Sequence, residues 1–364
     1  QLWRMAGHRS ASIGTLGVTT ADDQVATGLT TPDIVTFLSN MAGMKRMGIS
    51  HVAYEASSHG LDQYRAEGVR LKAAAFTNFS RDHLDYHPSM DAYFAAKMRL
   101  FDEVVPADGV AVVWTGDAKS GEVIEHASRR GLKLVTVGPG AETIELVSRA
   151  STPLGQQLLL RHEGKEQKLS LPLIGAYQMN NVLTAAGLVL ATGGDWATTL
   201  SGMARVSPVR GRLERAVISR AGAPVYVDYA HTPDAIEAAI AALQPHVAKK
   251  EGGRLITVLG AGGDRDEGKR PEMGAVAARL SDVVIITDDN PRSEDPAAIR
   301  KAVLAGAPDA IEVADRRAAI AEAIAMAKTG DIVLVAGKGH EQGQAIGDQV
   351  LPFDDVTVSR ECAA

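Results

Sequence analysis

The chain has 364 residues and a formal net charge of −6, from 38 lysine and arginine residues against 44 aspartate and glutamate residues. This length is too great for one small domain and predicts two. The mild negative charge argues against a nucleic-acid-binding face, because such faces are broadly basic. No apolar run approaches the roughly 18 residues that a membrane span needs. The only cysteine is Cys362, which excludes internal disulfides and cysteine-based zinc sites and suits a reducing cytoplasm.

Apolar periodicity predicts alternating strands and helices in the N-terminal part of the chain. Short buried strands are expected at 51–58 and 73–80, and a helix at 89–104 with Ser89 as its N-cap. The same criterion gives further strands at 109–115, 132–137, 144–149 and 156–161, and helices at 122–130 and 177–192. The strands at 144–149 and 156–161 are expected to be antiparallel.

A linker is predicted at 207–213, where proline and glycine separate two structured blocks. The block that follows has strands rich in Val and Ile at 225–229, 255–259, 283–287 and 332–335, and helices at 233–250, 270–280, 296–305 and 317–328. Apolar strands that alternate with helices predict a parallel sheet covered on both faces. In such sheets ligands bind at the carboxyl ends of the strands.

Charged residues beside glycine or proline follow each strand of this second block. The segments are 228–233 (DYAHTP), 260–266 (GAGGDRD), 288–292 (DDNPR) and 337–341 (GKGHE). Aspartate and glycine are common in turns, but a turn requires no Arg, His or Glu. The segments therefore predict a binding site at this edge of the sheet.

One of these segments resembles two nucleotide-binding motifs without completing either. The glycines of 260–262 follow a strand, but Arg265 stands where the dinucleotide fingerprint needs a third glycine. The run 263–269 matches the start of a Walker A loop, but Arg270 replaces the Ser or Thr that would bind Mg²⁺. Neither motif is therefore predicted to be functional.

Two charged residues are predicted in apolar surroundings. Lys97 falls in the middle of the apolar stripe of the helix at 89–104, where an ammonium is costly unless it is paired or neutralised. Lys97 either extends its stem to reach solvent or is held as a neutral amine that can be used in chemistry or modified. Glu55 lies within the strand predicted at 51–58, where a carboxylate would be buried unless it bound a metal or a cation.

Ordered motifs along essentially the whole chain resemble the Mur ligases. They are 55–61 (EASSHGL), 77–87 (TNFSRDHLDYH), 95–97 (AAK), 228–234 (DYAHTPD), 289–292 (DNPR) and 337–341 (GKGHE). The resemblance implies an α/β fold with two domains: a central ATPase domain over 1–208 with a sheet rich in parallel strands, and a Rossmann-like doubly wound domain over 209–364. The sequence contains neither the family's uridine-nucleotide domain nor its P-loop, so a fragment that does not turn over ATP by itself is expected.

The chemistry implied by this resemblance is ATP-driven amide formation through an acyl phosphate, with Mg²⁺ at the transferring phosphoryl group. Glu55, His83 and a carbamylated Lys97 match the family's magnesium ligands. A carbamate turns a cation into an anionic oxygen donor, which Mg²⁺ prefers. The implied partners are ATP, a UDP-N-acetylmuramoyl-dipeptide and meso-diaminopimelate, with no nucleic acid. A cytoplasmic monomer is expected.

Further residues match the family's ligand contacts position by position. Contacts with the UDP-N-acetylmuramoyl-dipeptide match Thr30, Thr31, Ser57, Gln63 and Arg65. Contacts with ATP match Asn181, Arg212, Asp228 and His231, while Gln178 stands where the family often has Asn. Contacts with diaminopimelate match Arg265, Asp289, Asn290, Pro291, Arg292, Gly337 and Glu341.

The motif at 289–292 indicates which amino acid is added. Relatives that add meso-diaminopimelate carry Asp-Asn-Pro-Arg, and the guanidinium of Arg292 can hold the second carboxylate of that amino acid with two hydrogen bonds. Lysine has no second carboxylate, and lysine-adding relatives lack the arginine. Glu341 can pair with the amine at the distal centre. The alternatives are a lysine-adding Mur ligase, a folylpolyglutamate synthetase, a non-catalytic nucleotide-binding module and a dinucleotide-dependent dehydrogenase.

Overall fold

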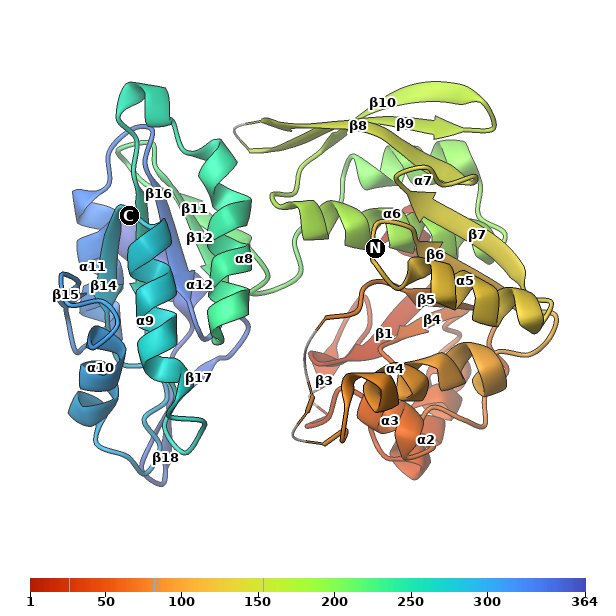
Figure 1. Ribbon diagram of the computed structural model, residues 1–364, viewed down its shortest axis with the longest axis horizontal. Helices are drawn as coiled ribbons and strands as arrows, with labels where there is room; N and C mark the ends of the chain where they lie inside the picture. The colour runs from red at the N-terminus through yellow and green to blue at the C-terminus, as the bar shows by residue number, and fades with distance from the viewer. Residues whose placement is uncertain (26, 81–82, 85, 153) are drawn as a thin grey trace. The chain divides into compact units, whose positions relative to one another are not determined.

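The chain forms two compact units in a computed structural model, shown in Figure 1, that describes residues 1–364 except 26, 81–82, 85 and 153. The first unit consists of residues 1–150, 156–172 and 177–206, and the second of residues 151–155, 173–176 and 207–364. Within the described residues, no helix has both the length and the apolar character that crossing a membrane requires.

The first unit contains two sheets, with strand orders β3-β2-β1-β4 and β10-β9-β8-β7-β6-β5. The pairs β1–β4, β5–β6, β6–β7 and β7–β8 are parallel, whereas β1–β2, β2–β3 and β9–β10 are antiparallel. The strands are β1 Ser10–Gly14, β2 Gly17–Thr19, β3 Gln24–Val25, β4 His51–Tyr54, β5 Ala73–Phe76, β6 Val110–Trp114, β7 Lys133–Gly138, β8 Ile144–Thr152, β9 Gly155–His162 and β10 Lys165–Leu171.

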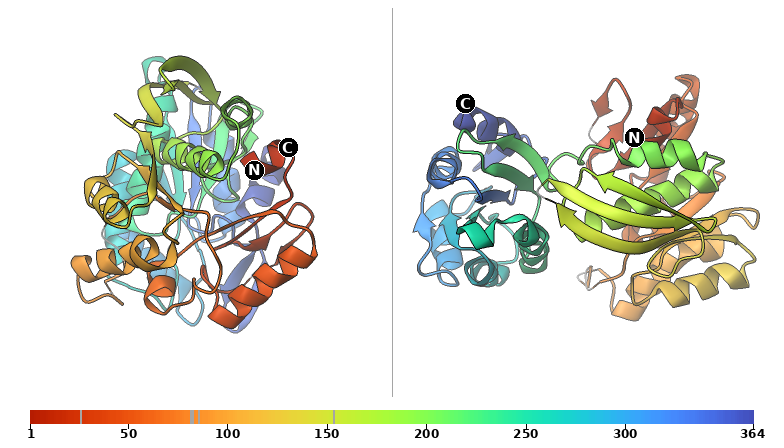
Figure 2. Two further views of the ribbon diagram at one scale, coloured as in Figure 1. Left: turned by 90° about the vertical axis from the view of Figure 1, so that its right-hand side faces the viewer. Right: turned by 90° about the horizontal axis from the view of Figure 1, so that it is seen from above.

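Helices cover these sheets. They are α1 Leu2–Met5, α2 Ile34–Arg46, α3 Ser58–Asp62, α4 Met90–Arg99, α5 Ser120–Arg129, α6 Ala176–Ala191 and α7 Trp196–Met203, with a π-helical turn, η1, at Leu100–Val104. Figure 2 shows α6 and α7 against the strands β8 to β10. Phe94 and Met98 of α4 pack with Val113 of β6 and Val123 of α5 in one buried cluster. The side chain of Ser89 accepts a hydrogen bond from the first turn of α4, which confirms the predicted N-cap.

Two strands predicted in this unit are shorter than expected. The strand predicted at 51–58 is β4 His51–Tyr54, and Glu55 therefore follows the strand instead of lying within it. The reason is that Ser57 caps α3, its hydroxyl accepting a hydrogen bond from the Gly60 N–H at 3.0 Å, so the extended run cannot continue. The strand predicted at 73–80 ends at Phe76. The small sheet β1 to β3, helices α2 and α7, and strand β10 were not predicted.

The second unit is built on one sheet with the strand order β11-β12-β16-β13-β14-β15. All neighbouring pairs are parallel except β11–β12, which is antiparallel. The strands are β11 Glu214–Ile218, β12 Pro224–Asp228, β13 Leu255–Leu259, β14 Val283–Ile286, β15 Ile311–Glu312 and β16 Ile332–Ala336, with a separate hairpin of β17 Gly343–Ile346 and β18 Gln349–Pro352. The predicted parallel sheet is confirmed, whereas β11, β15 and the hairpin were not predicted.

Helices cover both faces of this sheet, as predicted. They are α8 Pro233–Leu243, α9 Lys269–Leu280, α10 Pro296–Leu304, α11 Arg316–Met326 and α12 Asp355–Ala363, with 3₁₀ turns η2 Gln244–His246 and η3 Lys249–Glu251. Helix α8 ends before residue 250 because Pro245 follows its last turn and cannot continue the hydrogen-bond ladder. The unpredicted α12 packs beside α11.

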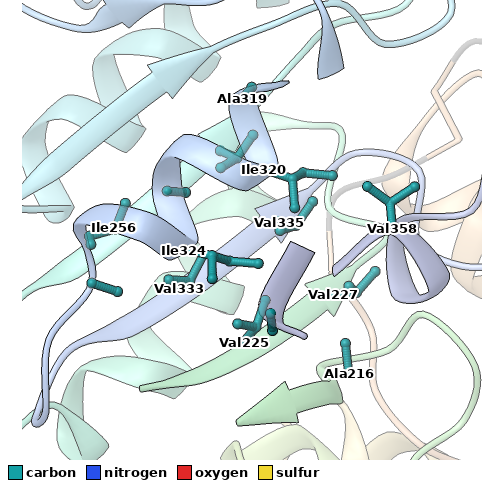
Figure 3. Packing of buried hydrophobic residues seen from close by; sticks show 14 of the residues in the cluster. Ala216, Val225, Val227, Ile256, Ala319, Ile320, Ile324, Val333, Val335 and Val358 are labelled. Atoms are coloured by element: carbon teal, nitrogen blue, oxygen red, sulfur yellow. The ribbon is translucent and has the colours of Figure 1, made fainter. Parts of the chain in front are cut away.

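The core of the second unit lies between the sheet and helices α11 and α12 (Figure 3). Val225 and Val335, on neighbouring strands, are fully buried, and Val335 lies beside Ile320 of α11. Burying one such side chain contributes about 1.5–3 kcal/mol. This rigid layer holds the loops at the carboxyl ends of the strands.

Candidate functional site

A cavity of about 1020 Å³ lies in the first unit. Its walls include the end of β4, the strand β5 and parts of α4 and α6. It gathers most of the residues that the sequence singled out in this unit, namely Thr30, Thr31, Glu55, Ser57, Arg65, His83, Lys97 and Asn181. Residues far apart in the sequence thus share one cavity, as a substrate site requires.

Thr31 ties the loop after β4 in place. Its hydroxyl donates to the carbonyl oxygen of Glu55 at 2.8 Å and accepts from the Ser57 N–H at 3.0 Å. The carboxylate of Glu55 accepts from the N–H and the hydroxyl of Thr15, at 3.3 and 3.2 Å. Sequence analysis missed Thr15, which contacts Glu55 only through the pairing of β1 with β4.

Arg65 and Gln63 form one hydrogen-bonded unit at this cavity. The guanidinium of Arg65 donates twice to the side-chain oxygen of Gln63, at 2.9 and 2.5 Å, and once to the carbonyl of Thr31 at 2.9 Å. The amide of Gln63 donates to the hydroxyl of Tyr86 at 3.0 Å. Gln63 therefore orients Arg65, although Gln63 itself does not line the cavity.

Lys97 is half-buried on α4 and lines the same cavity as Glu55 and His83. Its amine lies 5.1 Å from the ring centre of Tyr93, which is buried. His83 has a left-handed backbone conformation with φ of 54°, and its ring centre lies 5.6 Å from that of Tyr93. The carboxylate, the imidazole and the amine that the sequence linked to Mg²⁺ therefore border one cavity.

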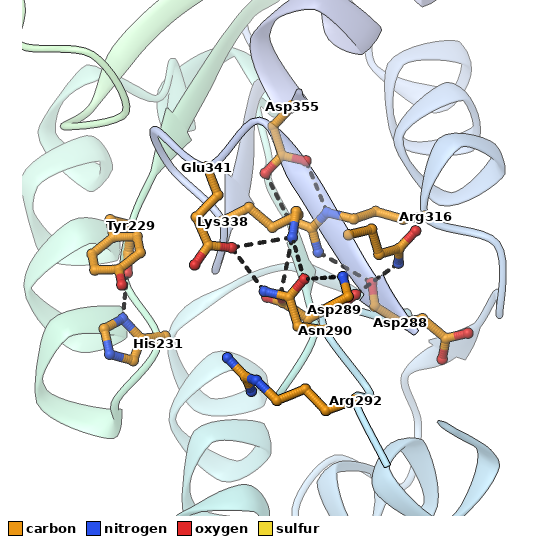
Figure 4. A network of polar contacts seen from close by, with 12 residues as sticks. Tyr229, His231, Asp288, Asp289, Asn290, Arg292, Arg316, Lys338, Glu341 and Asp355 are labelled. Carbon is orange, nitrogen blue, oxygen red and sulfur yellow. Dashed lines mark hydrogen bonds and ion pairs between the residues drawn. The ribbon is translucent and has the colours of Figure 1, made fainter. Parts of the chain in front are cut away.

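In the second unit, the loops after β14 and β16 meet through side chains (Figure 4). The Asn290 amide donates to a carboxylate oxygen of Glu341 at 2.8 Å, and the Lys338 amine donates to the amide oxygen of Asn290 at 2.8 Å. Gly337 has φ of +119°, and a Cβ there would lie 2.3 Å from a carboxylate oxygen of Asp289. Only glycine allows these two loops to approach so closely.

Arg292 has a strained backbone that a hairpin holds in place. Its φ of 52° is in the left-handed region, which costs about 1–3 kcal/mol for residues other than glycine. The Arg292 N–H donates to Ala345 at 3.0 Å, and its carbonyl accepts from the Gly347 N–H at 2.6 Å. Its guanidinium donates to the carbonyl of Gly263 at 2.7 Å. The hairpin and the loop after β13 thus define where this cation lies.

The end of β12 carries a second group of predicted residues. The carboxylate of Asp228 accepts from the N–H groups of Leu213 and Ala230, at 2.7 and 2.9 Å, while burial raises its pKa above the usual value. The guanidinium of Arg212 lies 4.9 Å from the ring centre of Tyr229. The ring N–H of His231 donates to the carbonyl of Tyr229 at 2.7 Å.

Two family models account for most of the sequence. Residues 1–189 match the Mur ligase middle domain, and residues 211–339 match the model described as Mur ligase, glutamate ligase domain.

The chain belongs to the Mur ligase family.

Curated relatives agree over nearly the whole length of this Mur ligase. A protein of Zymomonas mobilis named UDP-N-acetylmuramoyl-L-alanyl-D-glutamate--2,6-diaminopimelate ligase is 59% identical over 365 residues, which cover 99% of this chain and 74% of the relative. A relative of the same name from Caulobacter vibrioides is 50% identical over 362 residues, covering 98% of this chain and 74% of the relative.

Solved structures support the same fold. One titled as the structure of a UDP-N-acetylmuramoyl-L-alanyl-D-glutamate--2,6-diaminopimelate ligase has a TM-score of 0.72 at 32% identity, covering 100% of this chain and 74% of that one. A folylpolyglutamate synthase from Mycobacterium tuberculosis has a TM-score of 0.71 at 18% identity, covering 99% of this chain and 85% of that one. At that identity the likeness shows the fold alone.

Some residues that the sequence grouped together belong to different units or do not line the cavity. Asn181 belongs to the first unit, whereas Arg212, Asp228 and His231 belong to the second. Gln178 is buried in α6 and does not line the cavity. Arg265 is exposed, and its guanidinium donates to the carbonyl of Asp264 at 3.3 Å.

Sequence analysis also missed functional candidates in the second unit. Lys338 is fully buried between the loops that follow β14 and β16. The pair of Arg316 and Asp355 is equally buried, and Arg316 donates to the carbonyl of Ala336 at the end of β16. Lys338 lies inside the motif at 337–341, so the motif was visible, but nothing in its local pattern showed that the lysine points inward.

Proposed function

We propose that this Mur ligase takes part in forming an amide between the D-glutamate of UDP-N-acetylmuramoyl-L-alanyl-D-glutamate and meso-diaminopimelate, with ATP as co-substrate, in peptidoglycan synthesis. The observation that carries the proposal is the hydrogen-bonded pair of Asn290 and Glu341, with Arg292 in the same loop as Asn290, beyond the carboxyl ends of β14 and β16. Parallel sheets bind their ligands there. The names of the 59% and 50% identical relatives agree with it.

The incoming amino acid is bound by charges of both signs. Arg292 offers a planar fork for a carboxylate, and Glu341 offers a carboxylate for an ammonium. Diaminopimelate carries both groups at its distal centre, whereas lysine carries only the amine there. The remaining proposed contacts in this unit are Arg265, Asp289, Pro291 and Gly337.

The cavity of the first unit is the proposed binding site for the UDP-N-acetylmuramoyl-dipeptide and for the phosphoryl group that is transferred. Arg65, oriented by Gln63, supplies a fixed cation for an anionic part of the UDP-N-acetylmuramoyl-dipeptide. Thr30, Thr31 and Ser57 offer hydroxyl groups on the same wall. Asn181 from this unit and Arg212, Asp228 and His231 from the other are the proposed contacts with ATP.

Mg²⁺ fits the donor groups around Lys97. Among the described residues, no group of three or more His, Cys, Asp or Glu side chains is placed to hold a metal. Mg²⁺ in nucleotide-dependent enzymes is commonly held by one or two carboxylates with substrate phosphates and water. Glu55 and His83 supply two ligands, and a carbamate on Lys97 would supply anionic oxygen. When bound, the ion stabilises negative charge on the transferring phosphoryl group.

Binding of diaminopimelate tests the proposal directly. Isothermal titration of the chain with meso-diaminopimelate and with L-lysine should show binding of the first at least about a hundredfold tighter, since each 1.4 kcal/mol is tenfold. Equal affinity for the two amino acids would favour a lysine-adding enzyme. Titration with glutamate tests the folylpolyglutamate synthetase alternative.

We further propose domains at 1–208 and 209–364, and a cytoplasmic monomer.

A further inference from the structure

Lys338 is a buried cation at the centre of the loops that follow β14 and β16. Its side chain has no exposed surface. Its amine donates to the amide oxygen of Asn290 at 2.8 Å and to a carboxylate oxygen of Glu341 at 3.1 Å, and it lies 3.6 Å from a carboxylate oxygen of Asp289. Figure 4 shows these three side chains converging on Lys338. Two of the three ammonium protons are thus donated in hydrogen bonds, and Asp289 adds an ion pair.

This arrangement determines the orientation of the Asn290 amide. Its oxygen accepts from Lys338 and from the Ala345 N–H at 2.9 Å, while its nitrogen donates to Glu341 at 2.8 Å. Rotating the amide by half a turn would set the NH₂ group against two donors and the oxygen against a carboxylate. Each of these contacts would be repulsive, so only the observed orientation satisfies the groups.

The same contacts leave one oxygen of Glu341 and one amide proton of Asn290 without a hydrogen bond among the described residues. One carboxylate oxygen of Glu341, Oε2, is occupied by Lys338 and Asn290. In the part of the chain that the structure describes, Oε1 of Glu341 accepts no hydrogen bond, and the Asn290 amide has a second proton to donate. The Glu341 side chain is 31% exposed, whereas Asn290 is buried beside it. An acceptor and a donor side by side suit the ammonium and carboxylate of one amino-acid centre.

We propose that Lys338 is a positioning residue that sets Asn290 and Glu341 in the orientation that binds the distal amino-acid centre of diaminopimelate. This inference rests on the proposed function. Lys338 acts through its two neighbours and does not itself contact the ligand. Without its ammonium, the Asn290 amide oxygen keeps only the Ala345 N–H, and Glu341 loses one of the two donors that hold Oε2.

The test compares Lys338→Met with a matched control, Arg254→Met. Arg254 holds the buried Asp331 at 2.7 Å where β13 and β16 begin, at the opposite end of the same sheet. Both variants leave a buried carboxylate without its cation. In isothermal titration with meso-diaminopimelate, Lys338→Met should weaken binding about tenfold or more. Arg254→Met should bind meso-diaminopimelate with the affinity of the parent, even if its melting temperature falls as much as that of Lys338→Met.

A double-variant cycle separates positioning from general stability. In the Asn290→Ala background, Lys338→Met should weaken binding much less than it does in the parent, because part of its effect passes through Asn290. Full additivity, or equal losses for Lys338→Met and Arg254→Met, would overturn the proposal. So would unchanged binding in Lys338→Met.

A measurement on the ligand-free parent chain gives an independent result. In NMR spectra, the side-chain amide proton that Asn290 donates to Glu341 should exchange with water slowly, because Lys338 and Ala345 hold the amide oxygen and so keep this hydrogen bond in place. Rapid exchange would overturn the positioning role, even if Lys338→Met fails to fold. If the parent binds no diaminopimelate while this proton exchanges slowly, the proposed function fails and the fixed orientation of Asn290 stands.

Discussion

The guanidinium of Arg316 makes two hydrogen bonds to the carboxylate of Asp355, at 2.8 and 2.7 Å, and neither side chain is exposed. The same guanidinium donates to the carbonyl of Ala336, at 3.0 Å, where β16 ends. The pair therefore joins α11, α12 and the strand that leads into Gly337 and Lys338. It thereby supports the start of the loop after β16, which carries the proposed ligand contacts Gly337 and Glu341.

Arg316→Met should destabilise the second unit strongly. Removing one partner of a buried ion pair leaves the other charge without compensation, and such changes cost about 3–5 kcal/mol. The free energy of unfolding, measured by urea denaturation, should fall by that amount. Arg279→Met is the control, because Arg279 pairs with Glu237 on the surface at 57% and 50% exposure, and exposed pairs contribute about 0–1 kcal/mol. Equal losses in the two variants would contradict the prediction.

Lys97 should be carbamylated when bicarbonate is present. With ¹³C-labelled bicarbonate, NMR should show a carbamate carbon in the parent chain and none in Lys97→Ala. Lys119→Ala is a matched control, because its amine also lies beside an aromatic ring, 4.9 Å from the centre of Phe94, but Lys119 does not line the cavity. In an active enzyme, Lys97→Ala should abolish most amide formation, with partial rescue by short carboxylic acids. Unchanged turnover would show that the amine has no role in the chemistry.

Arg292→Ala should reduce diaminopimelate binding far more than lysine binding. The guanidinium would lose a charge-assisted pair with the distal carboxylate, which is worth about 1.5–3 kcal/mol, or about ten- to a hundredfold in affinity. Titration of parent and variant with both amino acids measures the difference. Arg279→Ala, on the surface at α9, should change neither affinity. If both amino acids lost affinity equally, Arg292 would support the loop through its bond to Gly263 instead of recognising the substrate.

His340 should make the second unit less stable in mild acid. Burial, and then the nearby Arg212, lower the pKa of His340 below 6.5, although Glu341 opposes the effect. The unfolded chain therefore binds a proton more readily than the folded chain just below pH 6.5. Stability should be fully present above that pH and should fall as the pH decreases toward the folded-state pKa.

The corresponding measurement follows the melting temperature between about pH 7.5 and pH 5.5, a range above that in which unperturbed carboxylates titrate. Asp228, whose pKa is raised by burial, is present in both proteins that are compared. His340→Gln, which cannot take up a proton, should show a flatter profile than the parent. His51, whose pKa is also lowered by burial, remains in both proteins and cancels in the comparison. Parallel profiles would mean that His340 is not held neutral by its surroundings.

The local sequence pattern was sufficient to predict the central strands of the second unit. Runs such as 255–259 and 332–335 are apolar throughout, and β13 and β16 follow them closely because a strand buried on both faces has no polar positions. The N-cap Ser89 was equally readable, since a cap depends on residues three apart. The prediction that Glu55 lies within a strand was wrong because Ser57 caps α3 and ends β4 early. The alternation of apolar residues does not show where a helix cap interrupts a strand.

Tertiary structure alone decided which strand-end residues meet. Strand β16 inserts between β12 and β13, so Lys338 reaches Asn290 across 48 positions of sequence. The left-handed Arg292 depends on a hairpin whose contacts with it are also distant in sequence. Periodicity indicates which face of a helix or strand is buried. The partner of a buried charge depends instead on the order of the strands in the sheet and on which loops lie close together. The sequence therefore determined the fold class and the motifs, whereas the packing of the loops decided that Lys338 is the buried centre of the site.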